Sequence, residues 1–296
     1  MRKHAYLIMA HNNEYILNKL ISLIDDERND IFLHIDKKVD LNLYLSQITP
    51  PQKSHFFVIK NRINTMWGHI SFVETELTLF EEAFQKGEYR YYHLISGVDL
   101  PIKSQNYIHN FFKKNDGIEF VGFDPNMTKY DRTDRVYKKH IATKHFKDPI
   151  IKRKICFFFD KTFIILQKIF NYKTFTTPKD FQIKKGCNWV SVTSDFVSYL
   201  LSRKKNILLM YKNAICPDEL FIQTTIYNSP FRKNIYQTTD EYEGCMRLID
   251  WTRGHPYVFN KDDIQLILNS NRLFARKFDI KNLEIVDLIY NHLNRQ

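Results

Sequence analysis

The stretch Ala5-Tyr6-Leu7-Ile8-Met9-Ala10 is a continuous apolar run of strand length near the start of a 296-residue chain. Apolar runs without polar alternation are typical of strands buried on both faces of a parallel sheet. Similar runs downstream predict further strands at residues 31–35, 56–59, 91–95 and 118–123.

Helical segments lie between these runs, and in residues 69–85 the side chains of Val73, Leu77 and Phe80 share one face. The alternation over the first 125 residues predicts an α/β fold with a mainly parallel sheet. The chain contains no internal repeat or Pro/Gly-rich linker, so we expect one domain over residues 1–296. Helices are predicted for 13–24, 69–85, 104–114, 194–202, 217–227 and 261–268, and strand-like structure for 181–193.

The composition, with 44% hydrophobic and 26% charged residues, is ordinary for a folded protein. Only eight glycines occur, and neither a dinucleotide-binding nor a P-loop glycine motif is present. The net charge of +11 predicts attraction to nucleic acid, anionic lipid or a nucleotide-sugar diphosphate. A basic nucleic-acid-binding module is a weaker alternative, because no motif of interleaved aromatic and basic residues accompanies the charge.

Four cysteines lie far apart in the sequence, at positions 156, 187, 216 and 245. Without a C-x-x-C pair or a Cys/His cluster, they indicate reduced thiols in a cytosolic compartment and no structural zinc. The apolar run after the N-terminus is too short for a signal peptide, and no 18-residue apolar stretch occurs. We therefore expect a cytoplasmic protein.

The segment 138–166 has two interpretations. Seven Lys or Arg and one acid lie between Lys138 and Lys154, and bulky apolar residues follow. Such a segment can dock on an anionic membrane, here at the inner face of the cell membrane. It can equally be a solvated loop followed by a core helix.

Two carboxylates follow predicted strands. Asp36 comes directly after residues 31–35, and Asp99 follows residues 91–95, with Pro101 stiffening the turn behind it. Ligands of open α/β sheets bind beyond the carboxyl ends of the strands, where these carboxylates could bind sugar or ribose hydroxyls. The alternative is that each carboxylate only stabilises its own turn.

Glu219 lies in Cys216-Pro217-Asp218-Glu219-Leu220-Phe221. Proline and acids in a first helical turn are ordinary helix-start chemistry. A carboxylate here can also act as a general base that deprotonates an acceptor hydroxyl during glycosyl transfer with inversion. Both interpretations remain open from these residues alone.

A departing nucleotide diphosphate must have its negative charge stabilised. The chain contains no D-x-D motif to hold a metal ion for this purpose; the nearest spacing match is Asp25-x-Glu27. Basic side chains can replace the ion, and Arg247, Arg276 and Lys277 are candidates. Trp67 and Trp189 could pack against a sugar ring, although core packing explains a lone Trp equally well.

Together these stretches resemble the core-2/I-branching β-1,6-N-acetylglucosaminyltransferase family, which also contains peptide-O-xylosyltransferases. They follow the family order along nearly the whole chain. The matching stretches are residues 5–12, 34–38, 67–68, 96–103, 186–193, 217–219, 247–251, 255–256 and 274–278.

The resemblance implies a GT-A fold, a single Rossmann-like domain with a nucleotide-sugar-binding half (about 1–125) and an acceptor-binding and catalytic half (about 126–296). It implies inversion at C1 without a metal or other cofactor, and a UDP-sugar donor, with UDP-GlcNAc favoured over UDP-xylose. Glu219 matches the catalytic base, Asp36 a uridine contact, and Arg247 with Lys277 the pair that holds the diphosphate. The other candidates are Arg276, His11 and Trp67 for the donor, and Asp99, Trp189, Asp218 and Trp251 for the sugar or acceptor.

The chain departs from the animal members, which carry a membrane anchor and many disulfide cysteines. It looks like a compact bacterial relative that acts on a glycan or lipid-linked glycan acceptor in surface polysaccharide synthesis. The acceptor-contacting segment of the family corresponds loosely to Lys129–His140.

Overall fold

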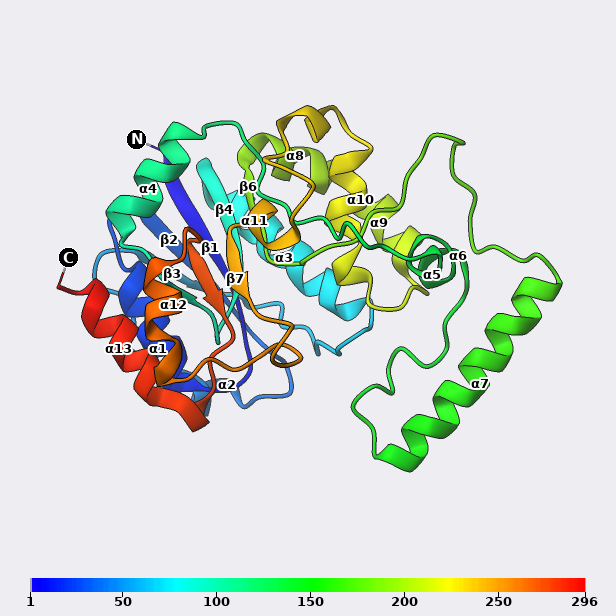
Figure 1. Cartoon of the computed structure of the whole chain (residues 1–296), viewed down its shortest axis with the longest axis horizontal. Coiled ribbons are helices and arrows are strands. Elements are labelled where there is room, and N and C mark those ends of the chain that lie inside the picture. Colours follow the sequence, from blue (N-terminus) through cyan, green and yellow to red (C-terminus); the bar gives the residue numbers. More distant parts are fainter. Residues whose placement is uncertain (1, 296) are drawn as a thin grey trace.

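A five-stranded sheet forms the centre of the computed structural model, which describes residues 2–295 (Figure 1). The strand order is β3-β2-β1-β4-β6. The first four strands are parallel and β6 joins antiparallel to β4, so the predicted α/β class with a mainly parallel sheet is confirmed. The strands are β1 (Lys3–Ala10), β2 (Asn29–Ile35), β3 (His55–Val58), β4 (Tyr89–Ser96) and β6 (Ser191–Thr193).

A smaller three-stranded sheet lies beside it, in the order β5-β8-β7. It consists of β5 (Leu100–Pro101), β7 (Arg247–Ile249) and β8 (Phe274–Arg276). β5 pairs antiparallel with β8, and β7 pairs parallel with β8. The small sheet therefore joins the chain after β4 to the C-terminal quarter.

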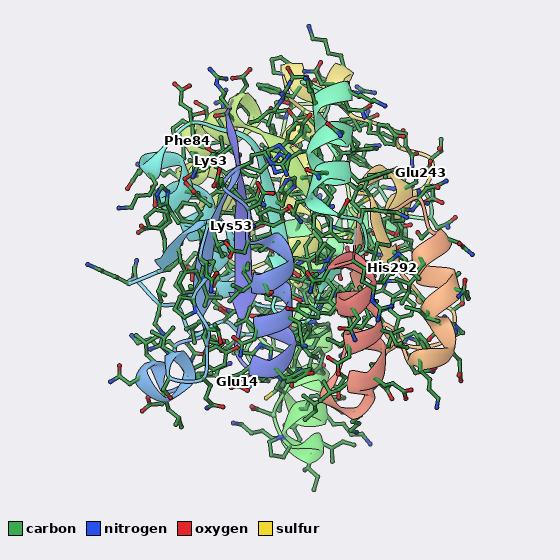
Figure 2. All side chains as sticks on the ribbon, turned by 90° about the vertical axis from the view of Figure 1, so that its left-hand side faces the viewer. Lys3, Glu14, Lys53, Phe84, Glu243 and His292 are labelled. Carbon is green, nitrogen blue, oxygen red and sulfur yellow. The ribbon has the colours of Figure 1, made fainter. Side chains whose placement is uncertain are left out.

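Two hydrophobic clusters lie on the two faces of the large sheet. Alternate residues of β1 enter each cluster: Leu7 belongs to one and Ile8 to the other. Figure 2 views the molecule from the side on which two helices, α1 and α13, run next to each other. One face is covered by α1 (Glu14–Ile24), α4 (Gln105–Lys114), α12 (Ile264–Asn269) and α13 (Leu283–Leu293), and the other by α3 (Ser71–Lys86), α8 (Ser194–Ser202), α9 (Lys204–Tyr211) and α10 (Phe221–Tyr227).

The remaining elements are short, except for one long helix. They are α2 (Leu41–Leu45), α5 (Lys129–Arg132), α6 (Asp134–Tyr137), α7 (Ile150–Ile169), α11 (Glu241–Gly244) and the 3-10 turns η1 (Pro217–Glu219), η2 (Pro230–Asn234), η3 (Lys261–Asp263) and η4 (Ile280–Asn282). No helix within residues 2–295 combines the length and apolar character needed to cross a bilayer.

Several local predictions need correction. Residues 118–123 form only isolated bridges at Glu119 and Phe120, and within 181–193 only the last three residues form a strand. The predicted helix 217–227 is divided, because Leu220 leaves helical geometry between η1 and α10. Asn13 precedes α1 in a left-handed conformation and makes no side-chain cap, whereas Ser104 caps α4 through the Tyr107 amide.

Candidate functional site

The carboxyl ends of the parallel strands bring the predicted residues to one edge of the large sheet. β1, β2 and β4 end just before His11, Asp36 and Gly97. Since β6 runs antiparallel to β4, its first residues lie at the same edge, with Trp189 just before them. Ligands bind beyond this edge in open α/β sheets.

A pocket of about 580 Å³ opens here, and four predicted residues line it: Glu219, Trp189, Trp251 and Arg276. The rest of its wall comes from residues 124–126, 185–188, 239–242 and Ile249. These segments come from the middle and the C-terminal part of the chain, so the pocket exists only in the folded protein.

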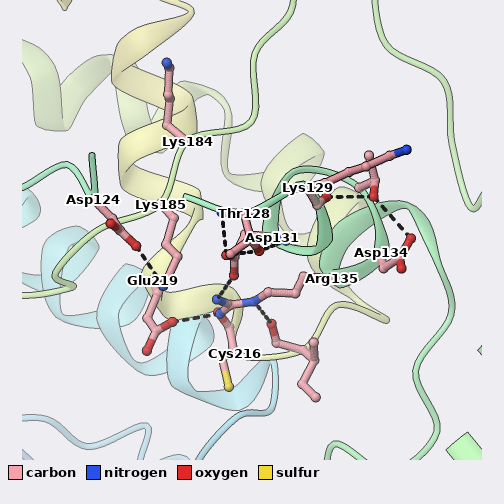
Figure 3. A network of polar contacts seen from close by, with 12 residues as sticks. Asp124, Thr128, Lys129, Asp131, Asp134, Arg135, Lys184, Lys185, Cys216 and Glu219 are labelled. Atoms are coloured by element: carbon pink, nitrogen blue, oxygen red, sulfur yellow. Dashed lines mark hydrogen bonds and ion pairs between the residues drawn. The ribbon is translucent and has the colours of Figure 1, made fainter. Parts of the chain in front are cut away.

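Glu219 is held by a buried arginine that sequence reasoning did not single out (Figure 3). Nη2 of Arg135 lies 2.8 Å from Oε2 of Glu219, and Nη1 lies 2.9 Å from Oδ1 of Asp131. The guanidinium also donates to the carbonyl oxygens of Ile215 and Cys216. The Glu219 side chain is 36% exposed, so the carboxylate is fixed by a cation on one side and open to the pocket on the other.

The backbone around Glu219 is fixed by two close contacts. The Cys216 amide donates to the Gly68 carbonyl, with Cys216 in a left-handed conformation (φ 45°). The Gly186 amide donates to the Glu219 carbonyl. A Cβ at Gly186 would lie 2.0 Å from the Gly122 carbonyl oxygen, so only glycine allows this approach.

Two cations line the pocket, Arg276 and Lys185, and Lys185 is paired with Asp124. Arg276 is held differently. Its guanidinium lies over the Trp189 ring, 4.5 Å from the centroid, and Nη1 donates to Oδ1 of Asp99 at 2.6 Å. Asp99 is 2% exposed and also accepts from the amide and hydroxyl of Ser96. The Asp99 carboxylate therefore orients Arg276, and the sugar-binding role predicted for Asp99 stays a prediction.

Asp36 and His11, both predicted to contact the donor, do not line the pocket. The Asp36 carboxylate accepts from the amides of Lys38 and Thr65, as the turn-stabilising interpretation predicts. Burial lowers the pKa of His11; the charge of Asp36 opposes this shift and the charge of Arg276 adds to it. The charges of Asp36 and Arg276 therefore both act on His11 at the end of the sheet.

Arg247, predicted to hold a diphosphate, lies inside the protein and does not line the pocket, so its diphosphate contact stays a prediction. Its side chain is 2% exposed, packs on the Phe274 ring and donates to the Val190 carbonyl and the Ser191 hydroxyl. Burial lowers its pKa. The partner predicted for it, Lys277, is not among the residues lining the pocket.

Two further candidates lie outside the pocket. Asp218 is buried and does not line the pocket, so its predicted substrate contact stays a prediction. Trp67 is half exposed and does not line the pocket. Its ring packs edge-on against the Phe146 ring, with 4.6 Å between the two ring centroids. Its contact with a donor stays a prediction.

Asp218 and Glu76 form a buried acidic pair behind Glu219. Burial, reinforced by the charge of Glu219, raises the pKa of Asp218 from 3.8 to about 7. Burial, reinforced by the charge of Asp218, raises the pKa of Glu76 well above its usual range. Oδ1 of Asp218 and Oε2 of Glu76 have no hydrogen-bond partner within residues 2–295. Both environments favour the protonated acids.

The contribution of Asp218 to the free energy of unfolding is expected to decrease as the pH rises from about 4 to about 7, because the folded state then binds the Asp218 proton that the unfolded state has released. Urea unfolding near pH 5 and pH 8 measures this decrease. Between these two pH values, the unfolding free energy of Asp218→Asn should decrease by about 2–3 kcal/mol less than that of the wild type.

The exposed Asp262→Asn provides the matched control and should keep the pH dependence of the wild type. An Asp218→Asn protein with the same pH dependence as the wild type would show that Asp218 is ionised throughout.

Sequence reasoning missed Arg135, the Lys185–Asp124 ion pair at 3.0 Å, and Glu241, whose pKa burial raises to about 7. No local signal marks them. Arg135 lies within the segment 129–140 that the resemblance associates with the acceptor, but its partner Glu219 is 84 residues away. Only the folded chain brings the two together.

The geometry defines an α/β protein in which an open carboxylate, Glu219, and an aromatic-stacked arginine, Arg276, line a pocket beyond the sheet. A family model described as "Core-2/I-Branching enzyme" matches residues 4–268, and the chain belongs to this family. The membership that the resemblance predicted is therefore confirmed. Within residues 2–295, no group of three or more His, Cys, Asp or Glu side chains is placed to hold a metal ion.

The names of the proteins that are similar to this chain refer to the transfer of different sugars. It is 22% identical to "Xylosyltransferase oxt" of Drosophila pseudoobscura pseudoobscura over 89% of this chain, but spans only 30% of that protein. It is 21% identical to the "N-acetyllactosaminide beta-1,6-N-acetylglucosaminyl-transferase" of Mus musculus, covering 93% of this chain and 68% of the relative. It is 22% identical to "Beta-glucuronosyltransferase GlcAT14B" of Arabidopsis thaliana, covering 93% and 62%.

Among solved structures, mouse xyloside xylosyltransferase 1 in its apo form aligns with 92% of this chain and 97% of its own. The TM-score is 0.38 and the sequence identity 11%.

Proposed function

We propose that the protein is an inverting glycosyltransferase that moves a sugar from a UDP-sugar to a hydroxyl group of a glycan acceptor, with Glu219 as the general base. The observation that carries this proposal is the open Glu219 carboxylate in the pocket that Arg276, Trp189 and Trp251 also line. Family membership supports the reaction class. The open carboxylate supports the assignment of the base.

In the proposed step, Glu219 accepts the proton of the acceptor hydroxyl while the hydroxyl oxygen attacks C1 of the donor sugar. The bond between C1 and the phosphate oxygen breaks, and UDP leaves with the bonding electrons. Arg135 holds the Glu219 carboxylate in place through a charged hydrogen bond. A positioned base of this kind contributes about 10²–10⁴-fold to the rate.

We assign the leaving diphosphate to Arg276, replacing the pair predicted from the resemblance. Arg276 lines the pocket, and the Trp189 ring beneath it and Asp99 beside it fix its orientation. A positioned guanidinium can donate two parallel hydrogen bonds to phosphate oxygens. Independence of a metal ion follows from this assignment as a further part of the proposal.

The donor sugar and the acceptor extend the proposal further. UDP-GlcNAc is the favoured donor and UDP-xylose the alternative; relatives with both activities in their names are similar to this chain. We propose a glycan or lipid-linked glycan of a bacterial surface polysaccharide as the acceptor, reached in the cytoplasm at the membrane. The nucleic-acid alternative is disfavoured, because the family model that matches most of the chain describes an enzyme and no motif of interleaved aromatic and basic residues accompanies the net charge.

A panel of UDP-, GDP- and CMP-sugars tests the donor. We expect UDP-GlcNAc to raise the melting temperature, because a ligand that binds only the folded state stabilises it. Slow hydrolysis or transfer from the same donor should persist in excess EDTA. Activity lost with the chelator and restored by Mn²⁺ would contradict the role given to Arg276.

A further inference from the structure

The outward side of α7 is apolar, the reverse of an ordinary surface helix. In Figure 1, α7 stands apart from the sheet and the helices that cover it. Its residues 151, 155, 158, 159, 162, 165, 166 and 169 recur at a spacing of three or four and share one face. All are exposed, and all except Thr162 are Ile, Leu or Phe.

The exposure is large along the whole helix: Ile151 is 73%, Phe158 67% and Ile169 69% exposed. A soluble helix places such residues against the core and its polar residues in water. An apolar surface of this extent marks an interaction site. The core-helix interpretation of residues 138–166 is therefore wrong for this face.

The opposite side of α7 holds the helix to the protein through polar groups. The buried Asp160 accepts from the Ala142 amide and pairs with His140 at 2.9 Å. Seven residues later, the buried Gln167 accepts a hydrogen bond from the Lys139 amide and donates one to the Lys139 carbonyl oxygen. These contacts hold the apolar face outward.

The charges beside the apolar face indicate what kind of partner covers it. Lys154, Lys161 and Lys168 are spaced by seven residues and form a stripe along one edge of it. Within the described chain, neither Lys154 nor Lys161 has an acidic partner, and Lys168 pairs with Asp134. The only acid of the helix, Asp160, is on the inner side. An apolar face beside a basic stripe, free of negative charge, fits the headgroup and acyl boundary of an anionic bilayer.

We propose that α7 is an interfacial helix that lies in the plane of an anionic membrane, with residues 151–169 inserted through the apolar face and the lysine stripe at the headgroups. The helix is linked to the pocket: His140, which Asp160 holds, also contacts the Asp134 carbonyl, next to Arg135. Membrane docking would therefore bring Glu219 close to a lipid-linked acceptor. The link to the acceptor rests on the proposed function; the binding of lipid does not.

Vesicle flotation tests the proposal. The wild-type protein should float with vesicles of phosphatidylcholine containing about a third phosphatidylglycerol at low salt, and less so in high salt, where screening weakens attraction. The double substitution Phe158→Gln/Ile165→Gln should lower partitioning at least about tenfold through lost apolar insertion. Lys154→Glu/Lys161→Glu should lower it by a similar factor, only on the anionic vesicles.

Matched controls change the same properties elsewhere on the surface. Leu43→Gln/Leu209→Gln removes two side chains that are each 64% exposed, and Lys113→Glu/Lys114→Glu makes the same change in charge on α4. Both should float as the wild type does. Absence of flotation of the wild type, or equal loss in controls and α7 variants, would overturn the proposal.

Two further readouts keep the outcomes distinct. Sedimentation without lipid tests whether a second copy of the chain covers the apolar face. If the wild type forms a dimer, the Phe158→Gln/Ile165→Gln protein does not, and neither binds vesicles, the face is assigned to self-association instead. Stabilisation by UDP-sugars should be the same in the α7 variants and the wild type. Its absence in the wild type would contradict the proposed function and leave the flotation result standing.

Discussion

Replacing Glu219 by Gln is expected to lower glycosyl transfer at least about a hundredfold, because the amide cannot accept the proton of the acceptor hydroxyl. The substitution keeps the size of the side chain, and the amide oxygen can still accept from Arg135. Folding should therefore change little. The loss should appear in kcat and in kcat/KM alike, since the proton transfer occurs only in the transition state.

Glu243→Gln is the matched control. Glu243 is a half-exposed acid of α11, close in sequence to the pocket residues 239–242, and its carboxylate lies 3.7 Å from the Arg272 guanidinium. It should keep full activity. Donor binding, measured as the rise in melting temperature that the UDP-sugar causes, should be the same in both variants. Unchanged turnover in Glu219→Gln would remove the residue from the role of base.

Substitution Arg135→Met is expected to cost about 3–5 kcal/mol of unfolding free energy, because it leaves Asp131 buried without its cation. It also removes the donors to the carbonyl oxygens of Ile215 and Cys216, which hold the turn before Glu219. Urea unfolding measures the first effect. Transfer activity of the folded protein should decrease as well, since the base loses its positioning contact.

A positioning role has its own signature in kinetics. In Arg135→Lys the charge remains, whereas the fork that contacts Asp131 and Glu219 together is lost, so stability should recover more than kcat does. Arg132 is exposed and lies on α5, three residues before Arg135. Its substitution Arg132→Met should have little effect on stability or on kcat. Equal stability and activity of Arg135→Met and the wild type would show that the pair with Glu219 has no function.

The α/β class could be predicted from the sequence because a strand buried on both faces needs an apolar run. Residues 5–10 and 31–35 carry this signal in the chain itself. Residues 118–123 carry it too, yet only Glu119 and Phe120 find partners, each in a single bridge. Strand formation there depends on which segments lie alongside, and a local pattern does not contain that information.

For the site, the sequence by itself determined the chemical groups: a carboxylate after a proline turn at Glu219, arginines near the C-terminus and Trp189 before a strand. The tertiary structure alone decided which of them meet. It turned Arg247 into the core and Arg276 onto Trp189, and it brought Arg135 to Glu219 across 84 residues. The physical reason is that a side chain's charge and shape are local properties. Its burial and its partners depend on packing between distant segments.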